Sequence, residues 1–169
     1  MQGGPGASSF AGIFTESGPL RINRNGTGPD DFEITKTDNS WLSIPRVNLL
    51  FLDNPVGAGF SFGNSYVTSL DEVSSEFQSF LSSFYALYPE FTNSDLYFTG
   101  ESYAGKYLSK ISHDILELNK KAEKKIPLKA LLISDPLVAP ATQRPNMYLL
   151  GRNQNMLDEN NMRQVSALI

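Results

Sequence analysis

Apolar and polar residues alternate along the chain in blocks that predict strands and helices in turn. The short, nearly continuous apolar run at 47–52 fits a strand buried on both faces, and 96–99 and 129–134 also have strand character. Over 70–88 and again over 103–118, apolar residues recur at helical spacing. Strands that alternate with helices favour parallel pairing, so the pattern predicts an open α/β sheet with flanking helices.

The helix predicted over 70–88 carries sequence signals at both of its ends. Ser69 and Glu72 have the spacing of a capping box, and Pro89 is expected to end the helix. The aromatic residues that line one face of this segment are typical of a core-facing stripe rather than a cofactor site.

The remaining segments are less regular. Residues 10–24 contain two glycines and a proline and suggest a short helical turn followed by a bend. Residues 25–39 are rich in Gly, Asp, Asn and Thr and are interpreted as a surface loop. The last part, 143–169, is polar with helical spacing. No internal repeat is present.

Composition narrows the classes of protein that the chain can belong to. The 169 residues are enough for one compact core, and 40% hydrophobic with 19% charged residues is ordinary for a globular domain. A net charge of −4 gives no sign of the basic surface that binds nucleic acid. No apolar stretch approaches a membrane span, no signal peptide is visible, and the absence of cysteine excludes disulfides and thiolate metal sites. We expect neither a cofactor nor a metal.

The segment around Ser102 is the strongest candidate for chemistry. It follows a predicted strand, precedes a predicted helix, and has the small residues Gly100 and Ala104 two positions away on either side. Such a turn is sharp, and it holds a serine hydroxyl clear of the backbone at the positive end of a helix. Small-residue turns are common, so the pattern alone is weak, but its context favours a nucleophile.

An acyl-transfer serine also needs backbone N–H groups directed at the developing oxyanion. The N–H of Tyr103, the first residue after the serine, is one candidate. The glycine-rich loop Gly3–Gly6 is the other, because glycine lets the backbone approach a substrate closely.

Four segments in order carry a resemblance to a known family: 2–9, 16–19, 53–61 and 100–107. With these motifs the chain resembles the serine carboxypeptidases, and the resemblance covers most of its length. Gln2 stands where many members have asparagine, which looks most like the vitellogenic carboxypeptidase-like branch. Ala7 stands where many members have cysteine.

The resemblance implies a partial α/β-hydrolase fold and removal of C-terminal residues from peptides or proteins through an acyl-enzyme. It implies that Ser102 is the nucleophile and that Gly4 and Tyr103 form the oxyanion hole. It also implies a network that binds the substrate carboxylate, formed by Gln2, Gly3, Glu16 and Glu101. The resemblance also implies that the protein is located in the lysosome or vacuole or is secreted.

The base and acid of a catalytic triad have no good candidates in this sequence. The only histidine, His113, lies 11 residues after Ser102 on the same predicted helix, about 16 Å away at 1.5 Å per residue. Asp135 ends a predicted strand and is interpreted as a turn residue, because the family's acid comes later. We therefore expect a fragment without activity of its own, with residues 1–142 forming a partial core and 143–169 the start of a cap insertion.

Two alternatives stay open. The same scaffold serves acyltransferases that use a sugar-ester donor, and a chain without base or acid can be a non-catalytic module that binds peptides or a partner. One N-glycosylation sequence, Asn25-Gly26-Thr27, lies in a turn-rich stretch, and its use is left open. The oligomeric state is also left open.

Overall fold

A computed structural model describes residues 1–167, except the side chains of Pro145 and Tyr148. The chain divides into two compact units, Met1–Pro136 and the residues from Leu137 onward. The second unit contains two helices, α4 (Pro140–Asn153) and α5 (Glu159–Ser166). None of the helices within residues 1–167 is long and apolar enough to cross a membrane.

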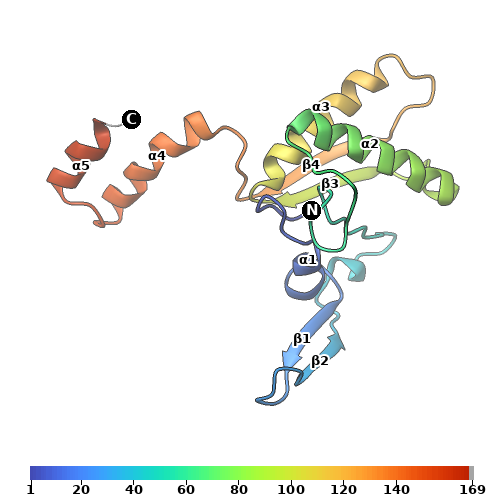
Figure 1. Ribbon diagram of the computed structural model, residues 1–169, viewed down its shortest axis with the longest axis horizontal. Coiled ribbons are helices and arrows are strands. Elements are labelled where there is room, and N and C mark those ends of the chain that lie inside the picture. The colour runs from blue at the N-terminus through green and yellow to red at the C-terminus, as the bar shows by residue number, and fades with distance from the viewer. Residues whose placement is uncertain (168–169) are drawn as a thin grey trace. The chain divides into compact units, whose positions relative to one another are not determined.

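The first unit is built on two parallel strands and two helices (Figure 1). Strand β3 (Leu96–Glu101) pairs with β4 (Leu128–Ser134), helix α3 (Ala104–Asn119) contacts both strands, and helix α2 (Leu70–Leu87) packs against α3. These four elements and the parallel pairing confirm the sequence predictions. Their buried side chains form the core: Val73, Phe77, Leu81, Phe98, Ala104, Tyr107, Leu108, Ile111 and Ile115.

A polar clasp joins the two helices beside this core. The buried Ser74 hydroxyl of α2 donates to Asp114 Oδ2 of α3 at 2.6 Å. Lys110 Nζ lies 3.0 Å from Asp114 Oδ1 and 2.6 Å from Asp71 Oδ1. Since the clasp links α2 to the middle of α3, it helps to hold in place the helix whose N-terminus carries the candidate nucleophile.

The capping box predicted at the start of α2 is present, since the Ser69 hydroxyl accepts from the Glu72 N–H and the Glu72 carboxylate accepts from the Ser69 N–H. Ser69→Ala should therefore lower the free energy of unfolding by about 1 kcal/mol, the usual value of an N-cap side chain. Chemical denaturation measures this change in the free energy of unfolding. The control is Ser75→Ala, at an exposed position inside α2. Equal stability of both variants would contradict the prediction.

The segment after the N-terminal loop differs from its prediction. Helix α1 (Phe10–Thr15) is the expected helical turn, but β1 (Leu20–Arg24) and β2 (Phe32–Lys36) form an antiparallel hairpin where a bend and a loop were predicted. Both strands alternate apolar and polar residues, which is a strand signal. The Gly, Asn and Asp residues at 25–31 belong to the turn between them.

The strand predicted over 47–52 is also wrong. The segment follows the short 3-10 turn Trp41–Ser43 and pairs with no other strand in residues 1–167. Its residues are half-buried or exposed, whereas the prediction was burial on both faces. An apolar run becomes a strand only when a neighbour completes its hydrogen-bond ladder, and periodicity carries no information about that neighbour.

Candidate active site

The predicted strand–turn–helix around Ser102 is present. Ser102 lies between the end of β3 and the start of α3 with a positive φ of +56°, an uncommon conformation for a residue with a side chain. Its N–H donates to the Ser134 carbonyl at the end of β4 (3.1 Å), and its carbonyl accepts from the Gly105 N–H (3.0 Å). These bonds hold the turn, and Ser102 itself is exposed.

The turn needs small residues because its neighbours leave no room for larger side chains. A Cβ added at Gly100 would lie 2.6 Å from Leu108 Cδ1 and 2.8 Å from Ala104 Cβ. Larger side chains at these positions would push α3 away from the end of β3.

The loop Gly3–Gly6 lies against this turn. A Cβ added at Gly3 would lie 2.8 Å from the Glu101 carbonyl and 2.9 Å from Ser102 Cβ. Gly4 has a φ of +108°, which side chains rarely allow. Within residues 1–167, neither the Gly4 nor the Tyr103 amide donates a hydrogen bond to another group, so both N–H groups are available to a ligand.

Tyr107 ties this loop to α3. Its side chain is 3% exposed, its hydroxyl accepts a hydrogen bond from the Gly6 N–H, and its ring lies 5.1 Å from that of Tyr103. Burial, only partly offset by the Gly6 bond, raises the pKa of Tyr107. In the sequence, Tyr107 lies within the helical pattern at 103–118 and at the end of the motif 100–107, but neither pattern indicates a contact with the Gly3–Gly6 loop.

Tyr107→Phe keeps the ring and removes the acceptor for the Gly6 N–H. We expect a loss of about 1 kcal/mol in unfolding free energy and faster hydrogen exchange at the Gly6 amide. Exchange measured by NMR tests both the local and the global effect. Tyr97→Phe, at an exposed tyrosine of β3, is the control. Unchanged exchange at Gly6 would show that the bond contributes nothing.

Three side chains implied by the family resemblance meet beside the turn. Gln2 Nε2 donates to Glu16 Oε2 at 2.8 Å, and the Glu101 carboxyl group hydrogen bonds with both Glu16 and Gln2. Gln2 is only 9% exposed. Gly12 of α1 lies beneath this network, since a Cβ there would be 3.5 Å from both the Gln2 Nε2 and Glu16 Oε2 atoms. Folding thus brings together residues up to 99 positions apart.

The pKa of Glu101 is raised. Burial is the largest cause, followed by the negative charge of Glu16, a hydrogen bond with Glu16 and the charge of Asp135, while the bond from Gln2 acts in the opposite direction. A raised pKa favours a protonated Glu101, and a protonated carboxyl group can donate a hydrogen bond as well as accept one.

Asp53 holds the loop 53–61 against α1 and the N-terminal loop. Its carboxylate accepts from the Ser8 hydroxyl (2.8 Å), the Ser9 N–H (2.7 Å) and the Phe60 N–H (2.9 Å). Burial opposes its charge, but these bonds outweigh burial and lower the pKa of Asp53. The motif 53–61 resembles the family, but nothing in it indicates that Asp53 forms these bonds. A cavity of about 230 Å³ next to Asp53 is lined by residues of 9–13, 51–53 and 60–61, and Ser102 does not line it.

The sequence gives His113 and Asp135 no place in a catalytic triad, and their positions in the structure agree with that interpretation. His113 is exposed on α3. Asp135 follows the end of β4 with a φ of +41°, which agrees with a turn residue, and its charge acts on Glu101.

The chain was compared with known proteins. The sequence profile of the serine carboxypeptidase family matches residues 1–169. A pheromone-processing carboxypeptidase of Penicillium rubens is 42% identical over 154 residues, which are 88% of this chain and 24% of the relative. The corresponding protein of Pyricularia oryzae is 40% identical over 164 residues, 95% of this chain and 25% of the relative.

A solved structure of a carboxypeptidase is also similar to this chain. The crystal structure of a prohormone-processing carboxypeptidase from Saccharomyces cerevisiae matches with a TM-score of 0.85 and 31% identity over 99% of this chain and 38% of that one. The partial α/β-hydrolase fold is therefore confirmed, whereas the vitellogenic branch is not. The chain spans about a quarter of the length of the curated relatives it matches. With its profile match over residues 1–169, the chain belongs to the serine carboxypeptidase family.

Proposed function

We propose that this chain provides the nucleophile and the carboxylate-recognition network of a serine carboxypeptidase that removes residues from peptide C-termini. The contact of Gln2, Glu16 and Glu101 next to the strained Ser102 turn supports it most strongly. A hydrolase acting inside a peptide needs no group for a free carboxylate, whereas one acting at the end does.

In the proposed reaction, the Ser102 hydroxyl attacks the carbonyl carbon of the last peptide bond as a base takes its proton. The oxyanion accepts hydrogen bonds from the Gly4 and Tyr103 amides. The C–N bond then breaks, the proton passes to the leaving amine, and water hydrolyses the ester on Ser102. The base and its acid partner are expected outside residues 1–169.

The recognition network should bind the terminal carboxylate through donors. The Gln2 amide donates at any pH, whereas Glu101 donates only while it is protonated. Gly3 places its backbone beside this network, since a Cβ there would touch the Glu101 carbonyl. Substrate binding in this proposal thus depends on the protonation of Glu101.

The sign of the pH dependence follows from the raised pKa of Glu101. Below that pKa the carboxyl group is protonated and binds the substrate carboxylate, and above it two negative charges repel each other. In the enzyme containing this chain, kcat/KM should fall as pH rises toward neutrality. Glu101→Gln, a donor at every pH, should flatten the fall, while Glu123→Gln in an exposed loop should not. A wild-type profile that is flat or rises through neutrality would contradict the proposal.

The function itself is tested with matched substrates. The enzyme containing this chain should cleave a blocked dipeptide with a free carboxylate and leave its C-terminal amide intact. Transfer from a sugar-ester donor without dipeptide cleavage would indicate the acyltransferase alternative, and binding without turnover would indicate a non-catalytic module. Residues 1–169 alone should show no turnover and no labelling by a serine-reactive phosphonate.

A further inference from the structure

The turn of the β1–β2 hairpin is held by bonds that leave two side chains free. The Asn25 N–H donates to the Asp31 carbonyl (3.0 Å), and Arg24 donates to the carbonyls of Gly26 (3.1 Å) and Thr27 (3.2 Å). Within residues 1–167, the side-chain amide of Asn25 and the Thr27 hydroxyl have no hydrogen-bond partner. In the one Asn-X-Ser/Thr sequence of the chain, the Asn25 side-chain nitrogen is the atom that accepts a glycan, and the Thr27 hydroxyl completes the sequence.

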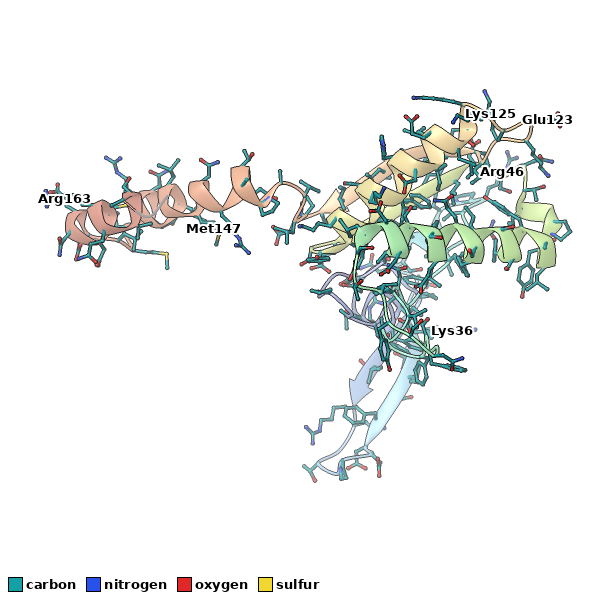
Figure 2. All side chains as sticks on the ribbon, turned by 45° about the horizontal axis from the view of Figure 1, so that its top comes forward. Lys36, Arg46, Glu123, Lys125, Met147 and Arg163 are labelled. Carbon is teal, nitrogen blue, oxygen red and sulfur yellow. The ribbon has the colours of Figure 1, made fainter. Side chains whose placement is uncertain are left out.

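The turn is also accessible. Asn25, Gly26 and Thr27 are all exposed, as are the strand residues next to them. The hairpin projects from the rest of the first unit, and its turn is the end away from Lys36 (Figure 2). An enzyme that modifies a folded protein can therefore reach this turn without unfolding the core.

One face of the hairpin is apolar and has little cover. Ile22 and Ile34 lie directly opposite each other in the register and are 48% and 61% exposed, and Phe32 is 54% exposed. The opposite face is polar, with Asn23 Nδ2 donating to Thr35 Oγ1 at 2.8 Å. An exposed apolar ribbon promotes association, and a bulky hydrophilic group at its end opposes it.

The side chains of Asn25 and Thr27 have no partner in the described part of the chain, their turn is accessible, and the apolar face of the hairpin is exposed. From these three observations together, we infer that Asn25 carries an N-linked oligosaccharide. The donor is an oligosaccharide on a polyprenyl diphosphate. The Asn25 Nδ2 atom forms a bond to the anomeric carbon as the bond from that carbon to the diphosphate breaks. The amide proton passes to a base of the transferase, and the diphosphate leaves as an anion. This site is separate from the proposed peptidase chemistry.

The test uses the full chain translated into microsomes behind a cleavable signal segment. A second Asn-Gly-Thr acceptor appended after Ile169 reports import in the same molecule. The wild-type chain should gain two endoglycosidase-sensitive glycans. Asn25→Gln and Thr27→Ala should gain one, and Thr27→Ser, which keeps the acceptor sequence, should gain two. A wild-type chain that carries only the appended glycan would overturn the inference.

Discussion

Ser102→Ala should lower kcat by about 10⁶-fold in the enzyme containing this chain, the scale seen when a serine nucleophile that works with a base is removed. Alanine keeps the backbone of the turn and removes the hydroxyl group that forms the acyl-enzyme in the proposed reaction. Stability should change by less than about 0.5 kcal/mol, because Ser102 is exposed and its turn is held by backbone bonds.

The measurement combines steady-state hydrolysis of a blocked dipeptide with labelling by a serine-reactive phosphonate. Both should disappear in Ser102→Ala and persist in Ser109→Ala, an exposed serine of α3. Labelling that survives in Ser102→Ala would assign the nucleophile to another residue.

Gly3→Ala should have the second largest effect. The added methyl group would meet the Glu101 carbonyl at 2.8 Å and Ser102 Cβ at 2.9 Å. Backbone has to move to make room, which costs about 1–3 kcal/mol of stability. Displacing the Ser102 turn from the Gly3–Gly6 loop by about 1 Å should lower kcat/KM by about 10²-fold.

Thermal unfolding and kcat/KM of the same variant separate these two effects. The control is Gly63→Ala, a substitution in an exposed loop. Its added methyl group would meet a methyl group of the Val56 side chain at 3.0 Å. If Gly3→Ala behaves like Gly63→Ala, the close contact between the loop and the Ser102 turn does not exist in solution.

Local patterns predicted the parts of the fold that depend on neighbours in sequence. Helical spacing and the capping box predicted α2 with its first residue, because an amphipathic helix and its N-cap form within a few residues. Residues 25–39 are rich in Gly, Asp, Asn and Thr, which favours a loop, but the alternating residues at 32–36 form β2. The run 47–52 was misjudged because a strand depends on a partner that the run itself does not specify.

The sequence by itself determined the Ser102 turn, since Gly100, Ser102 and Ala104 lie within five residues between a strand and a helix. Only the tertiary structure brought the Gly3–Gly6 loop against that turn and joined Tyr107 to Gly6, which no motif suggested. The family resemblance suggested the meeting of Gln2, Glu16 and Glu101, and the fold brought them into contact. Contacts between residues far apart in the chain depend on how helices and strands pack, and local sequence patterns do not record that packing.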